Sequence, residues 1–313
     1  MRNAFAQELT QLALENSKTV LLSGDIGNRL FDDFKSQNPE RFFNCGVAEA
    51  NMVTMAAGMA MNGLVPVLYT IASFMIYRPF EQIRIDIAYH KLPVLIVGVG
   101  GGLSYASNGP THHTLEDIAV MRSLPGMQVV CPGDAWEVRA ALRDFLSNPQ
   151  PTYLRLGKKG EALVHQEVPS DFSIGKALKV REGYAGALLA VGNMVPMALE
   201  MAEVLAQEGI DLAVYSFHTV KPLDDAVLRH CFSNYAWTFT LEEHSCIGGF
   251  SSAIAEWLVD RPFLPGKLKR LAFADRFIAE TGGQSYAREL SGFTLPSLSL
   301  IVQETFASTH VYA

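Results

Sequence analysis

The chain has 313 residues, of which 49% are hydrophobic and 18% charged, and its formal net charge is −7. That length accommodates two domains of ordinary size. The acidic balance and the lack of a Lys/Arg run argue against nucleic-acid binding, because no basic face would follow a phosphate backbone.

Cysteine usage and apolar runs favour a soluble, cytoplasmic protein. The first ten residues are mixed and polar, so we expect no signal peptide. The longest apolar run, Leu92 to Leu103, is too short to span a bilayer. Scattered cysteines without a close pair suit a reducing compartment. They are Cys45, Cys131, Cys231 and Cys246.

Short apolar strands alternate with helices along the first half of the chain. This alternation predicts a mostly parallel sheet with right-handed crossovers. Leu, Ile and Val dominate residues 92–99, which is typical of a strand buried on both faces. The expected strands are 19–22, 42–45, 64–69, 92–99, 127–131 and 151–156. The expected helices are 3–16, 49–61, 80–90, 114–123 and 135–146, the last capped by Asp134.

The composition becomes polar and weakly periodic after residue 157. We expect a linker at 166–182, which divides the chain into domains at 1–165 and 183–313. The predicted fold class is α/β, with two domains that each have a mainly parallel sheet flanked by helices. In the second domain we expect strands at 187–191, 212–217, 237–241 and 267–273, and helices at 195–207, 224–231 and 248–258.

The stretch FFNCGVAEANMVTMAAGMAMNG, residues 42–63, carries a helix that is apolar on nearly every face. Such a helix belongs inside a large core or between subunits. Glu49 is the one charged residue between Arg41 and Tyr69. A lone carboxylate there is costly unless it is paired or functional. The simpler interpretation is a helix-start carboxylate favoured by the dipole.

Two loops invite comparison with catalytic and cofactor motifs. In GPTHH, residues 109–113, His112 suits proton transfer and hydrogen bonding to hydroxyls, although backbone groups alone could also satisfy it. The glycine-rich loop at 98–102 follows a strand, but Leu103 stands where a dinucleotide fingerprint needs its third glycine. We therefore expect no nicotinamide binding.

Taken in order, these motifs resemble the transketolase family over nearly all of the chain. In that family the glutamate of the motif matching GVAEANMVTMAAGMAMNG hydrogen-bonds a ring nitrogen of thiamine diphosphate. It thereby promotes the imino tautomer that deprotonates the thiazolium carbon. The match places this role on Glu49. The family's GPTHQ motif matches GPTHH, which assigns His112 to the active site and replaces the glutamine with His113.

The resemblance also implies residues around the cofactor. Asp25, in SGD, matches an aspartate near the cofactor, with a turn residue as the alternative. The family stacks an aromatic ring on the aminopyrimidine from the loop after the strand at 64–69. Without gaps that position falls on Met75, with Phe74 beside it and Tyr77 nearby. A methionine sulfur packs on aromatic faces, and plain core packing is the alternative.

Three basic residues match positions that hold a substrate anion in the family. Arg2 precedes Asp25 at the family's spacing, and Arg29 replaces a serine that contacts phosphate. A fork-shaped cation changes that geometry. Lys158, in YLRLGKKG, aligns with a phosphate-binding arginine. A solvated surface charge is the alternative for Arg2 and Lys158.

Other positions depart from the family. Asn108 replaces an aspartate that contacts a sugar hydroxyl, and an amide hydrogen-bonds a hydroxyl without being an anionic acceptor. The glycine-rich loop lacks the His or Arg that binds substrate phosphate in relatives, which leaves open whether the substrate carries one. We expect the segment 242–244, Glu-Glu-His, to be structural or to lie at an interface.

The diphosphate-binding motif of the family, Gly-Asp-Gly followed by Asn, does not occur in the sequence. We therefore expect no metal site on this chain and a split enzyme. A partner, the N-terminal transketolase subunit, would carry Mg²⁺ and the diphosphate-binding domain. Thiamine diphosphate would lie between the two chains, and this chain would form a homodimer core within a heterotetramer.

The resemblance implies transfer of a two-carbon ketol unit from a ketose to an aldehyde. One alternative is the beta subunit of a 2-oxoacid dehydrogenase, which also lacks the diphosphate-binding domain. GPTHH favours a transketolase, because a histidine pair suits polyol substrates. The other alternative is a non-catalytic chain of the same fold. Glu49 argues against it, whereas the missing aromatic ring and loop histidine favour it.

Overall fold

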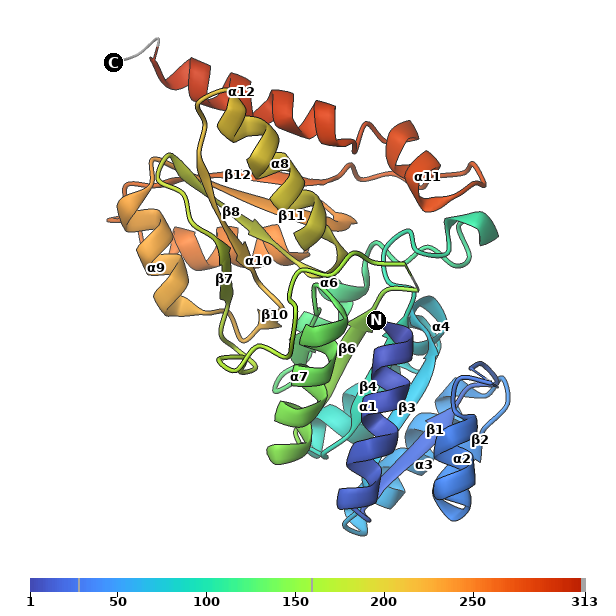
Figure 1. Ribbon diagram of the computed structural model, residues 1–313. Helices are drawn as coiled ribbons and strands as arrows, with labels where there is room; N and C mark the ends of the chain where they lie inside the picture. Colours follow the sequence, from blue (N-terminus) through green and yellow to red (C-terminus); the bar gives the residue numbers. More distant parts are fainter. Residues whose placement is uncertain (28, 159, 311–313) are drawn as a thin grey trace.

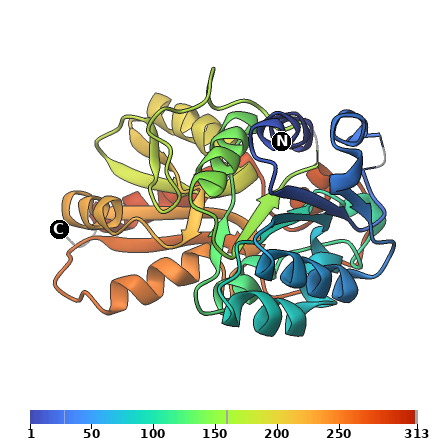
Figure 2. The same cartoon turned by 90° about the horizontal axis from the view of Figure 1, so that it is seen from below.

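Two mainly parallel sheets, each covered by helices on both faces, make up the protein (Figure 1). The computed structural model describes residues 1–27, 29–158 and 160–310. This arrangement confirms the expected α/β class with two sheets flanked by helices. Seen from below, the two sheet-and-helix units lie side by side, with α1 and α7 adjacent in the first of them (Figure 2).

The first sheet has seven strands within the described residues, in the order β10-β5-β6-β4-β3-β1-β2. All neighbours are parallel except β10, which pairs antiparallel with β5. The strands are β1 (Thr19–Ser23), β2 (Phe42–Asn44), β3 (Val65–Ile71), β4 (Leu95–Val99), β5 (Gln128–Val130), β6 (Thr152–Leu156) and β10 (Thr219–Lys221).

The second sheet has five strands in the described part of the chain, in the order β12-β11-β8-β9-β7. Here β7 is the one antiparallel member, beside β9. The strands are β7 (Leu178–Arg181), β8 (Gly186–Ala190), β9 (Leu212–Ser216), β11 (Trp237–Ser245) and β12 (Lys267–Phe273).

The helices of the first unit bury apolar faces on both sides of its sheet. α1 and α7 cover one face through Phe5 and Leu142, and α3 covers the other through Met52. The helices are α1 (Arg2–Glu15), α2 (Asp32–Gln37), α3 (Glu49–Met61), α4 (Ala72–Tyr77), α5 (Phe80–Gln82), α6 (Asp117–Arg122) and α7 (Ala135–Ser147). A π-helical segment, η2 (Ile83–Tyr89), and two 3₁₀ turns, η1 (Pro39–Arg41) and η3 (Ala106–Asn108), complete this unit.

In the second unit α8 and α12 lie together on one face of the sheet, and α10 packs on the other (Figure 1). The helices are α8 (Val195–Gln207), α9 (Asp225–Asn234), α10 (Phe250–Val259), α11 (Gln284–Leu290) and α12 (Leu295–His310), with a 3₁₀ turn, η4 (Gly192–Met194). No helix in the described ranges combines the length and apolar character needed to cross a bilayer.

Two short strands depart from the sequence expectation. Residues 178–181, inside the predicted linker, form β7 at the edge of the second sheet. Residues 219–221, predicted to lead into a helix, form β10 and extend the first sheet instead. Both strands are too short to carry a periodic signal and form through tertiary pairing. The positions of the domain boundaries stay predictions.

One hydrophobic cluster runs through both sheets. It joins Leu68 and Ile96 of the first sheet to Leu189 of the second, and Phe250 of α10 belongs to the same cluster. Each of these four side chains is fully buried. The two units therefore share a hydrophobic core and are not joined by the linker alone.

A buried arginine ties the two units together. The Arg155 side chain is 4% exposed, and its Nε donates to Asp117 Oδ2 at 2.7 Å. Its Nη2 donates to the carbonyls of Thr114 at 3.2 Å and Glu243 at 2.9 Å. Tyr153 also donates to Asp117 Oδ2, at 2.7 Å. A charge buried in this way is tolerated because it is paired and hydrogen-bonded.

We expect Arg155→Met to lower the free energy of unfolding by about 3–5 kcal/mol, because it leaves the carboxylate of Asp117 buried without its cation. Urea denaturation of the full chain measures this loss. Arg84→Met changes an exposed arginine on η2 and should alter stability by less than about 0.5 kcal/mol. A loss for Arg155→Met as small as that control would contradict the structural role.

Candidate functional site

Predicted site residues gather at the carboxyl edge of the first sheet, where parallel α/β sheets bind ligands. Glu49 begins α3 shortly after β2, and α4 follows β3 directly. The carboxylate of Glu49 is 4% exposed. Nη1 of Arg78 donates to its Oε1 at 2.8 Å and to its Oε2 at 3.0 Å. Glu49, the one charged residue between Arg41 and Tyr69, is therefore buried and paired with Arg78.

An aromatic ring and a histidine continue from this pair. The guanidinium carbon of Arg78 lies 4.1 Å from the centroid of the Phe74 ring. The Phe74 and His112 rings meet edge to face, with centroids 5.0 Å apart. Glu49, Arg78, Phe74 and His112 thus form one contiguous group. Sequence reasoning missed Arg78, since nothing local distinguishes it from a surface arginine.

The surroundings of His112 favour its uncharged form. Its Nδ1 lies 2.9 Å from Oγ1 of Thr111. Partial burial lowers the pKa of His112, and the nearby His113 and Arg78 lower it further. A lowered pKa favours the uncharged imidazole, which can accept a proton or a hydrogen bond.

Tyr105 joins the histidine to a predicted anion-binding lysine. Its ring centroid is 6.3 Å from that of His112, and Nζ of Lys158 lies 4.6 Å from the Tyr105 centroid. Sequence reasoning did not identify Tyr105. Gly100 makes room for it, because a Cβ at that glycine, whose φ is +81°, would overlap the Tyr105 ring.

The glycine-rich loop has no space for the side chain that relatives carry there. A Cβ at Gly101 would lie 2.6 Å from Nε of Arg155. At Gly102 it would overlap the carboxylate of Glu243. Glu243 is fully buried and accepts from Asn193, Gln284 and Arg288. The loop therefore packs against Glu243 of the second unit.

Arg2 and Arg29 line a shared hollow of about 360 Å³ beside α1. Nε of Arg2 is buried and has no hydrogen-bond partner among the described residues. Burial raises the pKa of Tyr69, an effect that Arg2 opposes and Tyr105 reinforces. The hollow is otherwise lined by residues of α1 and by Leu30 and Asp33.

Met75, the position that the ungapped match gives for the stacking side chain, is buried in the structure. This side chain is 0% exposed and belongs to the hydrophobic core. Phe74, its neighbour on α4, is half-buried and faces His112. A helix turns successive side chains by about 100°, so only one of the two reaches the site. The candidate stacking ring is therefore Phe74.

Four other predicted residues lie outside the contiguous group. Asp25 is exposed, has a φ of 55° and accepts from Nδ2 of Asn44 at 3.0 Å. Tyr77 donates to Glu116 at 2.8 Å and turns from Phe74 toward a second hollow.

That second hollow, of about 280 Å³, is lined by Tyr77 and by His113, whose Nε2 lies 3.5 Å from the carbonyl of Ala106. Asn108 is exposed at the end of η3, and α11 of the second unit packs against η3 (Figure 1). The loop that bears GPTHH therefore contacts both units.

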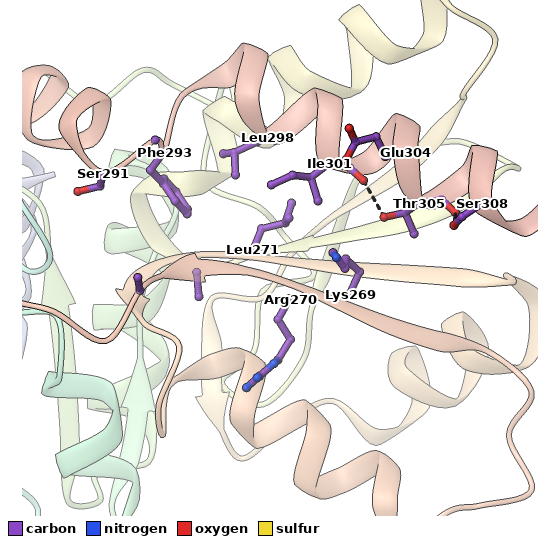
Figure 3. A pocket seen from close by; sticks show the side chains of 13 residues that line it. Lys269, Arg270, Leu271, Ser291, Phe293, Leu298, Ile301, Glu304, Thr305 and Ser308 are labelled. Atoms are coloured by element: carbon purple, nitrogen blue, oxygen red, sulfur yellow. Dashed lines mark hydrogen bonds between the residues drawn. The ribbon is translucent and has the colours of Figure 1, made fainter.

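A hollow of about 490 Å³ lies between β12 and α12 of the second unit, and no predicted site residue lines it (Figure 3). Arg270 points away from α12 and donates to the carbonyl of Cys246 at 3.1 Å. Within the described residues, no group of three or more His, Cys, Asp or Glu side chains is arranged to hold a metal ion.

Two family models match the chain: the transketolase pyrimidine-binding domain at residues 1–160 and the transketolase C-terminal domain at 175–295. The chain belongs to the transketolase family. The 6-deoxy-6-sulfo-D-fructose transketolase subunit of Clostridium sp. (strain MSTE9) is 37% identical over 94% of this chain and 90% of that relative. An apulose-4-phosphate transketolase subunit of Phocaeicola vulgatus is 33% identical over 83% of this chain and 84% of that relative.

A solved structure with the same organisation is the inactive beta4 tetramer of a split-gene transketolase. It matches with a TM-score of 0.89 and 35% identity, covering 97% of both chains. Together with the subunit relatives, this supports the expected recognition of the chain as a C-terminal section of a split transketolase.

We expect His112 to protonate at a lower pH than an ordinary histidine, because burial and neighbouring positive charge disfavour its charged form. Side-chain NMR titration of the full chain measures this. Arg78→Met should raise the pKa of His112 toward its ordinary value. An unchanged titration in that variant would show that Arg78 does not act on the imidazole.

Proposed function

We propose that this chain is the C-terminal subunit of a split transketolase that uses thiamine diphosphate held between two chains. The observation that carries the proposal is the buried carboxylate of Glu49, set at the sheet edge beside the Phe74 ring and His112. An aminopyrimidine requires two groups: an acid that hydrogen-bonds a ring nitrogen, and an aromatic ring that stacks on its face. The residues therefore fit this half of the cofactor.

When bound, thiamine diphosphate would supply the nucleophilic carbon that transfer of a ketol unit requires. Glu49 hydrogen-bonds the ring nitrogen and sets the tautomer. Phe74 stacks on the ring. His112, in its uncharged form, accepts a hydrogen bond or a proton from a donor hydroxyl. Asn108 and His113 are proposed to contact further hydroxyls, and Asp25 and Tyr77 stay predicted cofactor neighbours.

The remaining requirements are assigned to a partner. We propose that an N-terminal transketolase subunit carries Mg²⁺ and grips the diphosphate, and that two copies of this chain form the core of the assembly. The split-gene neighbour is an inactive beta4 tetramer, which supports self-association of such a chain without activity.

The substrate is proposed to be a ketose with a terminal anion. Arg2 and Arg29 supply positive charge in the hollow beside α1, and Lys158 supplies it next to Tyr105. The Nε of Arg2 lacks a partner within the described residues. Two relatives are named for sugars that bear a sulfo group or a phosphate. A guanidinium pair suits either tetrahedral oxyanion.

In the complex with its partner, Glu49→Gln should lower kcat by about 100-fold or more, because the amide cannot share a proton with the ring nitrogen. Steady-state ketol transfer measures kcat, and circular dichroism checks the fold. Glu81→Gln, an exposed glutamate near α4, is the matched control and should leave kcat unchanged. Retained turnover in Glu49→Gln would overturn the assignment.

Arg2→Met should raise KM for an anion-terminated ketose about tenfold or more and leave KM for an uncharged ketose unchanged, since only the former loses a charge-assisted hydrogen bond. A panel of ketoses and 2-oxoacids measures both effects. An equal rise for both sugars would contradict an anion contact. Activity confined to 2-oxoacids would favour a dehydrogenase beta subunit.

A further inference from the structure

One side chain makes both contacts that the proposed function assigns to the aminopyrimidine. The guanidinium of Arg78 donates to both oxygens of Glu49, at 2.8 and 3.0 Å. Its central carbon also lies 4.1 Å from the centroid of the Phe74 ring. The acid and the aromatic face are thus engaged by a single group of this chain.

The guanidinium and the aminopyrimidine have similar recognition chemistry. Both are planar, both present nitrogen atoms along an edge to a carboxylate, and both lie on aromatic rings. Because each would use the same acid and the same ring face, the two cannot be bound there together.

The guanidinium and the aminopyrimidine require different protonation of Glu49. A guanidinium only donates hydrogen bonds, so the carboxylate beneath it acts only as an acceptor. A ring nitrogen that receives a hydrogen bond needs a donor on the glutamate. While Arg78 stays in place, Glu49 cannot play the part proposed for it.

We propose that Arg78 occupies the aminopyrimidine position in the free chain and leaves it when the cofactor binds. This inference rests on the proposed function. Arg78 acts as a placeholder that satisfies the buried acid of an unpartnered subunit, and the cofactor displaces it. A buried carboxylate without a partner would otherwise destabilise the free chain.

The position and contacts of the Arg78 side chain allow it to move. It follows α4 directly, and its side chain is 46% exposed. Within the described residues, Glu49 and the Phe74 ring are the contacts that hold its guanidinium. An exposed, long side chain changes rotamer on a nanosecond scale without backbone rearrangement.

Departure of Arg78 also changes His112. The positive charge of Arg78 helps to lower the pKa of His112. Once the guanidinium swings away, the imidazole becomes a better proton acceptor. Filling the cofactor position would thereby prepare the histidine that contacts the substrate.

The test measures binding of the aminopyrimidine half alone, 4-amino-5-hydroxymethyl-2-methylpyrimidine, to the full chain by calorimetry. We expect Arg78→Met to lower its Kd about tenfold relative to the unmodified chain, because the competing guanidinium is gone. Arg84→Met removes an exposed arginine on η2 and should bind as the unmodified chain does. Arg78→Gln, which keeps a donor for Glu49 without the flat guanidinium, serves if the Met variant is unstable, and it should also bind more tightly.

Weaker binding by Arg78→Met would show that the arginine holds the ring, and unchanged binding would show that it does not compete. Either result overturns the placeholder. The proposed function fails by a different readout, retained turnover of Glu49→Gln in the complex. Lost turnover in Glu49→Gln together with unchanged binding in Arg78→Met would therefore reject only the placeholder.

Discussion

The buried guanidinium of Arg155 is the constraint on which the site depends. It extends from β6 of the first sheet and donates to the carboxylate of Asp117 on α6. It also donates to the backbone carbonyls of Thr114, which follows the two histidines, and of Glu243 in the second unit. In low-dielectric surroundings each of these bonds is strong and each missing one is costly. The histidine loop is therefore fixed by the same charge that joins the two units, and its geometry cannot relax independently.

Around this fixed loop the site combines one buried acid with several cations. Glu49 is the acid and Arg78 is paired with it. Lys158 lies over the Tyr105 ring, and Arg2 and Arg29 line the hollow beside α1. In the proposed function, the acid meets a ring nitrogen of the cofactor and the cations hold the anionic end of the substrate. The carboxyl edge of a parallel sheet is where open α/β folds bind ligands.

Much of the architecture followed from patterns in the sequence. The helix at Glu49–Met61 was predicted within its observed bounds, because an apolar run bounded by glycines leaves few alternatives. The short strands β7 and β10 could not be predicted, since they exist only through pairing with distant partners. α11 and α12 were not anticipated either: α11 is short, and α12 is only weakly amphipathic.

The site was predictable where the chemistry is local and unpredictable where it is tertiary. His112 lies in a motif, and it was found from that motif. Arg78 and Tyr105 matter only because folding brings them to the acid and the histidine. The choice between Phe74 and Met75 depends on the phase of a short helix, which an ungapped comparison with relatives does not fix.

The single apolar cluster that passes through both sheets has a mechanical consequence. A chain with two domains on a free linker can open and close like a jaw, but shared packing of this kind resists bending between the halves. In the proposed two-chain assembly, access for small molecules would then depend on how this chain approaches and leaves its partner. Association with the partner would then control the entry of small molecules.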